Sequence, residues 1–202
     1  MIDLSKSDGI WTLRLDRPEK ANSLTLEMLE RIAEIARQAA NARALVITGT
    51  GKVFSAGADL DAVKTGLATS DVWEAASGAI ADLPCPTIAA LNGTMAGGAF
   101  GMVLACDIRL AVPTARFFYP VMKLGYLPQP SDPIRMSKLI VTARSKMILV
   151  AGQIINADEA LNYGLIQRIC QPEELMEQAI ELVQDACATT PEHAAAIKKM
   201  CG

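Results

Sequence analysis

The chain has 202 residues, of which 51% are hydrophobic and 20% are charged, and its net charge is −3. This composition excludes a disordered chain and predicts a single α/β domain with a substantial core. The near balance of 19 basic and 22 acidic residues argues against binding to nucleic acid or to an anionic membrane surface. Five scattered cysteines without a CxxC pair predict a reduced, cytoplasmic protein that holds no metal.

No segment of the sequence has the pattern of a signal peptide or a membrane helix. The N-terminus is polar and acidic within a few residues, which is not typical of a signal peptide. The most apolar stretch, residues 88–106, contains Asn92 and four glycines and is followed by Asp107 and Arg109. We therefore expect a buried strand and helix there, not a membrane span.

Strand and helix patterns alternate through the first two thirds of the chain. Period-2 alternation and continuous apolar runs predict strands, while apolar residues at helical spacing predict helices. In chain order we expect a hairpin over residues 4–16, a helix capped by Thr25, a strand over 44–48, a helix over 70–83, a strand over 87–91, a helix over 97–105 and a strand over 107–112.

The last third of the sequence is dominated by helical patterns. The expected helices cover residues 134–150, 158–163, 173–188 and 191–200. No linker or low-complexity tract separates them from the preceding part. We therefore expect residues 1–150 to form the core and residues 151–202 a C-terminal helical segment of the same domain.

Two segments rich in small residues, 54–60 and 92–101, follow predicted strands. Asp59 is expected to cap the turn in the first segment and to orient its amides. The second segment opens a helix, and the first N–H groups of a helix have no intrahelical acceptor and carry partial positive charge. Two such turns at the ends of neighbouring strands can direct one amide each at a single oxygen. That arrangement is an oxyanion hole for an enolate or a tetrahedral anion.

Other interpretations of these turns are weaker or remain open. Close packing of the backbone explains either glycine-rich turn alone. A dinucleotide site is excluded, because residues 97–101 do not have the G-x-G-x-x-G spacing.

Several short motifs together resemble the enoyl-CoA hydratase/isomerase (crotonase) superfamily. Each motif alone is weak, but their order and spacing cover about residues 10 to 200. The matching segments are RPEKANSL at 17–24, FSAGADL at 54–60, NGTMAGG at 92–98, ACDIR at 105–109, LGYLP at 124–128 and ADEALNYGLI at 157–166.

The resemblance implies a fold, a substrate and a set of site residues. The fold would be an α/β spiral of ββα units, assembled as a trimer or hexamer. The substrate would be an acyl-CoA thioester, with coenzyme A as part of the substrate and no permanently bound cofactor. The amides of Ala58 and Gly98 would form the oxyanion hole. The residues expected along the coenzyme A path are Asn22, Ser23, Ala56, Ala58, Asp59, Leu60 and Lys64.

The sequence departs from the family where hydratases carry their glutamates. Counting along the motifs, the two glutamate positions fall on Gly101 and Val121, and an alternative carboxylate position falls on Gln129. Asp61 stands where hydratases often have a lysine that faces phosphate, so Lys64 or Lys52 would have to substitute. The resemblance also implies a longer C-terminal helical region than residues 151–202 provide.

Three other side chains are candidates for moving a proton. Asp132 is either a displaced base or, as we expect from Asp-Pro at a helix start, the N-cap of the helix that follows. Tyr119 and Tyr126 flank the expected pocket and either contact the acyl group or are buried tyrosines with satisfied hydroxyls. The sequence thus favours an isomerase, decarboxylase or hydrolase acting on acyl-CoA. A catalytically inactive acyl-CoA-binding protein is the alternative, and classical hydration is disfavoured.

Overall fold

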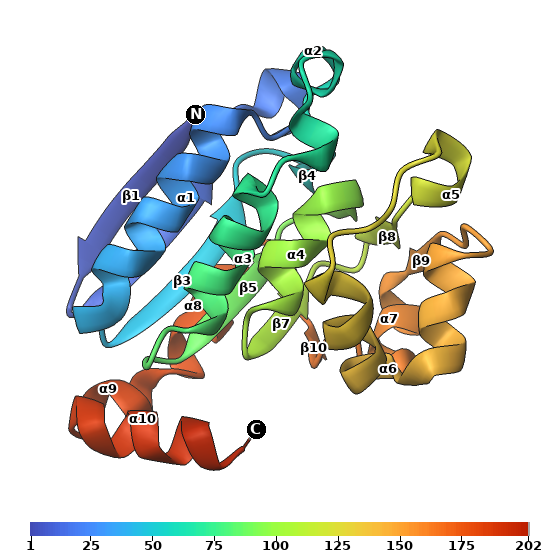
Figure 1. Cartoon of the computed structure of the whole chain (residues 1–202). Helices are drawn as coiled ribbons and strands as arrows, with labels where there is room; N and C mark the ends of the chain where they lie inside the picture. The colour runs from blue at the N-terminus through green and yellow to red at the C-terminus, as the bar shows by residue number, and fades with distance from the viewer. Residues whose placement is uncertain (202) are drawn as a thin grey trace.

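The chain folds into a six-stranded and a four-stranded sheet with helices packed around them (Figure 1). The computed structural model describes residues 1–201. In the larger sheet, β1 is antiparallel to β2 and every other neighbouring pair is parallel. In sheet order, its strands are β1 (Ile2–Ser7), β2 (Ile10–Leu15), β3 (Ala44–Gly49), β5 (Thr87–Leu91), β7 (Ile108–Ala111) and β10 (Arg168–Ile169).

The smaller sheet lies at the carboxyl ends of three strands of the larger one. Strands β4, β6 and β8 run parallel to one another, and β9 pairs with β8 in the antiparallel sense. Its strands, in sheet order, are β4 (Val53–Ser55), β6 (Thr94–Ala96), β8 (Arg116–Phe118) and β9 (Ile155–Asn156).

Three successive ββα units connect the two sheets. Each unit places its first strand in the larger sheet and its second strand in the smaller sheet, and then continues into helices. The helices after β4 are α2 (Leu60–Lys64) and α3 (Val72–Ala81). Those after β6 and β8 are α4 (Phe100–Leu104), α5 (Val121–Leu124) and α6 (Ser131–Leu149). This arrangement confirms the expected α/β spiral of ββα units.

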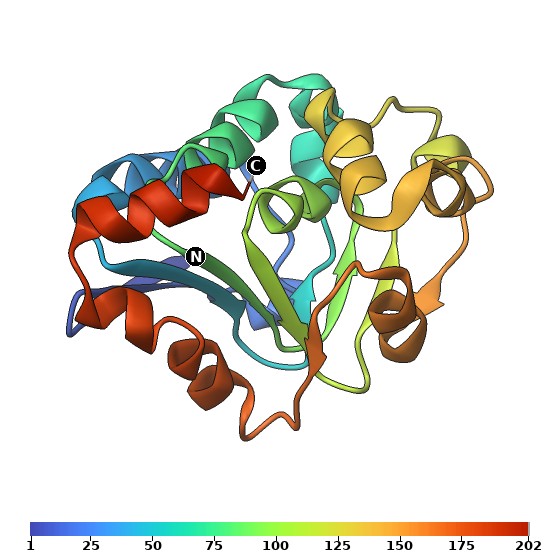
Figure 2. The same cartoon turned by 90° about the horizontal axis from the view of Figure 1, so that it is seen from below.

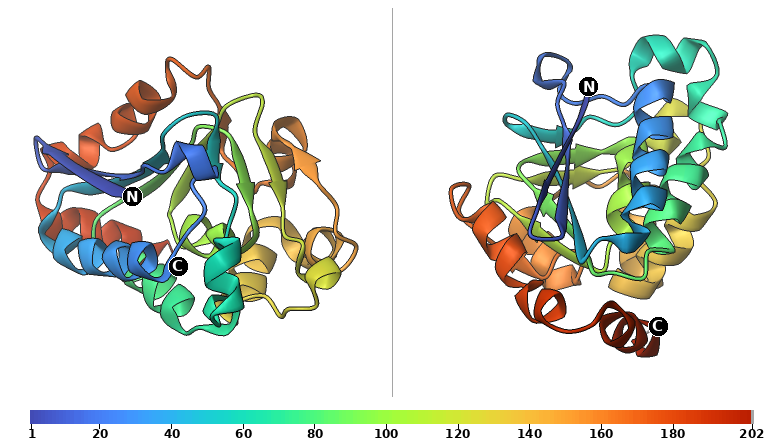
Figure 3. Two further views of the ribbon diagram at one scale, coloured as in Figure 1. Left: turned by 90° about the horizontal axis from the view of Figure 1, so that it is seen from above. Right: turned by 90° about the vertical axis from the view of Figure 1, so that its left-hand side faces the viewer.

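Burial explains why the central strands are continuous apolar runs. Every residue of β3 and β5 is buried, because helices cover both faces of the larger sheet. Figure 2 shows α1 (Leu26–Gln38) and α3 on one side of this sheet and α8 (Leu175–Glu181) on the other, and Figure 3 gives two further views. Three short 3-10 helices, Pro18–Lys20, Ala39–Asn41 and Leu67–Thr69, lie between these elements.

The N-terminal hairpin and first long helix are confirmed. Asp8 and Gly9 have positive φ angles of 51° and 81°, which form the tight turn between β1 and β2. The Thr25 side chain accepts a hydrogen bond from the Met28 backbone N–H at 3.3 Å, as expected of an N-cap. The apolar face of α1 is buried against the larger sheet and α3.

The region after residue 150 is mainly helical, as expected, but it also contains two strands that the sequence did not predict. Both strands lie at sheet edges: β9 is the last strand of the smaller sheet and β10 is the last strand of the larger sheet. Each has two residues, too short to show a period of two in sequence. The expected helix over 173–188 is two helices, α8 and α9 (Gln184–Ala188). Helices α7 (Ala157–Tyr163) and α10 (Pro191–Met200) agree with expectation.

No helix within residues 1–201 has both the length and the apolar character that a membrane crossing requires.

Candidate functional site

Two turns at the same edge of the smaller sheet are in contact with each other. The first follows β4 and the second follows β6, and these neighbouring strands are parallel, so their carboxyl ends meet. Gly57 has a φ of 87°, and a Cβ atom at this position would lie 2.8 Å from the Ala96 carbonyl oxygen and 3.4 Å from the Gly97 Cα. Only glycine permits both the conformation and this close approach. The two backbones therefore lie side by side.

The N–H group of Ala58 faces away from the strand-like segment that precedes α1. The Leu24 N–H donates to the Gly57 oxygen at 2.7 Å, and the Asp59 N–H donates to the Leu24 oxygen at 2.9 Å. These bonds make a parallel bridge centred on Ala58. Because successive N–H groups of extended backbone point to opposite sides, the Ala58 N–H is directed away from Leu24.

Gly98 presents its N–H at the start of a helix. It is the second residue of the 3-10 helix Gly97–Ala99, which continues into α4, and N–H groups at this position have no intrahelical acceptor. A Cβ atom on Gly98 would lie 2.8 to 3.1 Å from three atoms of the Trp73 ring. The buried Trp73 indole is fixed by donating to the Leu67 oxygen at 2.8 Å. Glycine at this position thus allows the helix start to pack directly on the indole.

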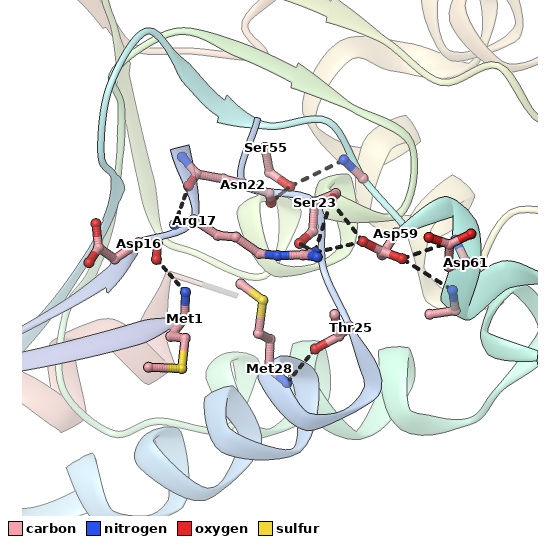
Figure 4. A network of polar contacts seen from close by, with 12 residues as sticks. Met1, Asp16, Arg17, Asn22, Ser23, Thr25, Met28, Ser55, Asp59 and Asp61 are labelled. Atoms are coloured by element: carbon pink, nitrogen blue, oxygen red, sulfur yellow. Dashed lines mark hydrogen bonds and ion pairs between the residues drawn. The ribbon is translucent and has the colours of Figure 1, made fainter. Parts of the chain in front are cut away.

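A network of hydrogen bonds holds the first turn in place (Figure 4). Asp59 caps α2 by accepting from the N–H groups of Asp61 and Ala62, as expected from the sequence. Its other oxygen accepts from the Arg17 guanidinium at 2.6 Å and from Ser23 at 3.3 Å. The hydrogen bond from Arg17, followed by that from the Ala62 N–H, lowers the pKa of Asp59 to about 2. Asp59 is therefore ionised at neutral pH and serves as a fixed acceptor beneath the turn.

Asn22 and Ser23 lie behind the turn and not in the wall of the cavity. The fully buried Asn22 amide donates to the Thr50 and Val53 oxygens, and its Oδ1 accepts from the Arg17 N–H. Ser23 is also buried. We infer that both residues position the 54–60 segment. Their expected contact with coenzyme A stays a prediction.

A cavity of about 340 Å³ opens where the two turns meet. Ala56, Ala58 and Leu60 line it from the first turn, and Gly97 and Gly98 line it from the second. None of the described residues that line the cavity carries a charge. The remaining lining residues are Val63, Ala68, Trp73, Tyr119, Pro120, Val121, Leu124, Tyr126, Leu127 and Gln129.

Tyr119 and Asp132 are joined directly. The Tyr119 hydroxyl donates to Oδ2 of Asp132 at 2.9 Å, and the Gln129 N–H approaches the same hydroxyl at 3.5 Å. Tyr119 lines the cavity, and its ring stacks on Phe100 with ring centroids 5.3 Å apart. Asp132 lies behind it with no solvent exposure.

The expectation that Asp132 caps a helix is wrong. Helix α6 begins at Ser131, and its side-chain cap comes from α3, because Glu74 Oε1 accepts from the Ser131 N–H at 3.1 Å and from the Ser131 hydroxyl at 2.9 Å. Asp132 is the second residue of the helix and makes no cap bond. A capping partner that is distant in sequence cannot be recognised from the local Asp-Pro pattern.

Burial dominates the titration of this pair. Desolvation raises the pKa of Asp132 to about 7, and the Tyr119 hydroxyl opposes the shift in part. Desolvation and the adjacent carboxyl group raise the pKa of Tyr119 above its ordinary value. Near neutral pH the carboxyl group of Asp132 therefore exists in both protonation states, whereas Tyr119 keeps its proton.

The other expected residues lie at the rim or outside the cavity. Tyr126 lines the cavity and is 40% exposed. Lys64 is at the surface, paired with Asp61 at 2.8 Å. Val121 and Gln129, two of the three positions where the motif spacing leads us to expect carboxylates, line the cavity. The sequence did not indicate that Trp73 and Leu127 line the cavity. Trp73 lies in a helical pattern and Leu127 lies in a loop, and neither pattern shows which residue contacts the glycine turns.

Comparison with known proteins supports one family throughout the chain. The sequence model of the enoyl-CoA hydratase/isomerase family matches residues 5–201. Carnitinyl-CoA dehydratase of Salmonella typhi is 35% identical over 207 residues, covering 98% of this chain and 79% of the relative. Enoyl-CoA hydratase from Bacillus anthracis superposes with a TM-score of 0.89 at 32% identity, covering 98% of this chain and 81% of that chain. Enoyl-CoA hydratase EchA8_6 from Mycobacterium marinum gives a TM-score of 0.90 at 27% identity, covering 99% and 98%.

Proposed function

The chain belongs to the enoyl-CoA hydratase/isomerase family, and from that premise we propose that it binds an acyl-CoA thioester and stabilises the enolate formed from it. The N–H groups of Ala58 and Gly98 act as the oxyanion hole. The supporting observation is that both residues line one cavity from two turns in contact. One such donor typically contributes about 3 to 4 kcal/mol to the transition state.

The chemistry of the lining favours reactions that depend on stabilising an anion at the thioester oxygen, either an enolate or the tetrahedral anion of hydrolysis, more than on a strong base in the wall. Isomerisation, decarboxylation and hydrolysis of an acyl-CoA are the candidate reactions. Decarboxylation fits best, because loss of CO₂ requires stabilisation of the enolate but no initial proton abstraction. Hydration requires groups that activate water. Val121 and Gln129 line the cavity without being able to do so.

The coenzyme A part of the substrate enters along the first turn. Ala56, Ala58 and Leu60 line the cavity there, and Leu60 is 78% exposed at its mouth. Asp59, with Asn22 and Ser23 behind it, holds this stretch of backbone in place. Lys64 is the cation on α2 available to the phosphates, and to reach them it exchanges its exposed partner Asp61 for the ligand.

Replacement of Gly98 tests the amide directly. Gly98→Pro removes the N–H group and adds a Cβ atom against Trp73, whereas Gly98→Ala adds the Cβ atom and keeps the N–H group. We expect turnover of malonyl-CoA or methylmalonyl-CoA, measured by release of CO₂, to be at least about 100-fold lower in Gly98→Pro than in Gly98→Ala. Equal turnover in these two variants would show that the amide does not act on the thioester.

A catalytically inactive acyl-CoA-binding protein is the second candidate. The uncharged cavity lining favours it, because none of the described lining residues is an aspartate, glutamate, histidine or lysine. This function predicts binding of acyl-CoA by titration calorimetry without turnover in a broad panel of thioesters. Turnover that is lost on Gly98→Pro and kept on Gly98→Ala would exclude it.

A further inference from the structure

One oxygen of a fully buried carboxyl group has no hydrogen-bond partner. Asp132 has 0% exposure, and its Oδ1 is a buried atom without a donor among residues 1–201. Its other oxygen is bonded to Tyr119. An unsatisfied buried polar atom costs about 1 to 3 kcal/mol or more, so folding alone gives no reason to keep it. Packing of the core therefore gives no account of this oxygen.

The orphan oxygen packs closely against Gly101 of α4, a residue without a side chain. A Cβ atom on Gly101 of α4 would lie 3.2 Å from Asp132 Oδ1. Gly101 is also the position where the first hydratase glutamate is expected from the motif spacing. The carboxyl group of Asp132 on α6 therefore lies next to Gly101 on α4, the position where the motif spacing leads us to expect a glutamate. Tyr119 lines the cavity and is bonded to this carboxyl group, which is not among the lining residues.

We propose that Tyr119 and Asp132 form a proton relay that serves the α-carbon of the thioester bound in the cavity. This inference rests on the proposed acyl-CoA function and identifies its acid–base group. Tyr119 is the member that touches substrate. Asp132 acts through Tyr119 and holds the proton that Tyr119 gives or receives.

The relay balances without any further reactant. In proton removal, the α C–H bond breaks and its electron pair enters the enolate, whose charge develops on the thioester oxygen held by the amides. The Tyr119 oxygen takes the proton from the carbon while its own proton moves to Asp132 Oδ2. In the reverse direction the enolate carbon receives the Tyr119 proton, and the carboxyl proton of Asp132 replaces it. Decarboxylation uses only this second direction, with the carboxyl proton restored from solvent.

The charged groups around Asp132 set the pH range of the relay. Glu74 on α3 raises the pKa of Asp132 and Arg135 on α6 lowers it, both less strongly than burial, which brings it to about 7. Tyr119 is its hydrogen-bond donor, and α4 contributes the uncharged Gly101. Proton abstraction requires the carboxylate and should increase as pH rises through about 7. Protonation of an enolate requires the neutral acid and should decrease over the same range.

Deuterium exchange in D₂O tests the relay without knowledge of the natural acyl group. The probe is but-3-enoyl-CoA, whose α-protons are acidified by the thioester and the double bond, with incorporation measured by mass spectrometry. We expect the α-protons of the probe to exchange at least about 100-fold more slowly with Tyr119→Phe or Asp132→Asn than with the wild-type protein. The dissociation constant of the probe, measured by calorimetry, should be unchanged. The exchange rate of the wild-type protein should show an inflection near pH 7, which Asp132→Asn lacks.

Two further variants distinguish a relay from a structural role. Gly101→Ala places an apolar methyl group beside Oδ1 and should move the inflection to higher pH, which a purely structural carboxyl group would not do. This variant and Tyr119→Phe decide the matter if Asp132→Asn does not fold. Asp158→Asn, an exposed aspartate in the first turn of α7, is the matched control and should exchange at the wild-type rate.

The outcomes separate the relay from the function on which it rests. A protein that does not bind the thioester contradicts the proposed function and the relay together. Binding without exchange in the wild-type protein overturns the relay alone. Exchange that survives in Tyr119→Phe and Asp132→Asn, with the inflection retained, also overturns the relay. In either case, a difference in CO₂ release between Gly98→Pro and Gly98→Ala would still support the role of the Gly98 amide.

Discussion

Asp132 should make stability depend on pH in the opposite sense from most carboxyl groups. Its pKa is raised from 3.8 to about 7 in the folded protein, so the folded state binds this proton more tightly than the unfolded state. The stabilisation is complete below about pH 4 and is lost as pH rises through about 7. A shift of this size corresponds to roughly 4 kcal/mol, since each pKa unit is about 1.4 kcal/mol.

Urea unfolding of wild-type protein and Asp132→Asn between about pH 4 and pH 8 measures this effect. We expect the unfolding free energy of the wild-type protein, relative to the variant, to fall with increasing pH. Tyr119→Phe should shift the midpoint of that change upward, because the hydroxyl group lowers the pKa of Asp132. A difference between wild type and Asp132→Asn that is independent of pH would show that the carboxyl group is not perturbed by burial.

Residues of the site were predictable from sequence to the extent that their roles are local. Asp59 caps the turn that it precedes, and Thr25 caps the helix that it precedes. Asp132 has the same local signature, but Glu74 takes the capping role from another helix. Its contact with Tyr119 joins residues from two separate elements. Such a contact depends on tertiary packing, which neither spacing nor composition encodes.

At the scale of elements, helix α2 and the preceding turn depend on Asp59. Asp59→Ala removes the cap and the partner of Arg17, and it should lower the unfolding free energy by about 2 kcal/mol. It should also weaken thioester binding, because the Ala58 backbone adjoins the lost contacts. Asp59→Asn keeps an oxygen for the cap, so its unfolding free energy and its thioester affinity should lie between those of Asp59→Ala and the wild-type protein. Thermal unfolding and calorimetry measure both effects.

The pH dependence of this element has the usual sign for an aspartate. The pKa of Asp59 is lowered to about 2, so its contribution is present above about pH 4 and is lost as pH falls toward 2. Asp61→Asn, in the same helix, is the control, because its pair with Lys64 is exposed and should not measurably affect stability. Equal stability of Asp59→Ala and wild type would refute the role of this cap.

Long elements were predictable from their period, and short ones were not. Helix α1 and strands β3 and β5 agree with expectation within a few residues, because burial of one helix face or both strand faces leaves a clear pattern. Strands β4, β6 and β8 have three residues each, and the sequence pattern predicts none of them. Their pairing builds the sheet edge on which both amide turns stand, so the geometry of the site depended on elements too short to detect.

At the scale of the whole molecule, the order of the motifs predicted the arrangement of strands in two sheets, which the hydrophobic periodicity did not. Alternating strands and helices indicated an α/β protein but did not assign strands to two sheets. The resemblance to the crotonase superfamily supplied the spiral of ββα units, which the topology confirms. The two sheets therefore have different roles. The larger sheet is buried on both faces and forms the core, whereas the parallel strands of the smaller sheet end in the turns that line the cavity.

The exposed apolar surface leads us to expect an oligomer. Large apolar side chains are exposed at both ends of the molecule, for example Leu127 (88%) near the cavity mouth and Met200 (86%) on α10. Beside α10, an apolar groove of about 540 Å³ is lined by residues that include Pro86, Ile108 and Ile197. An exposed apolar groove often marks a surface that another chain covers.

The exposed surface favours association, and the family resemblance implies three or six subunits, so we predict a trimer or hexamer with a mass three or six times the chain mass of 21.5 kDa. Light scattering after size exclusion, repeated over a dilution series, measures the mass and shows whether subunits dissociate. Because association removes apolar surface from water, salt should weaken the assembly little, whereas dilution should weaken it by mass action. A mass of 21.5 kDa at every concentration would contradict the prediction and would leave the groove beside α10 exposed in the functional protein.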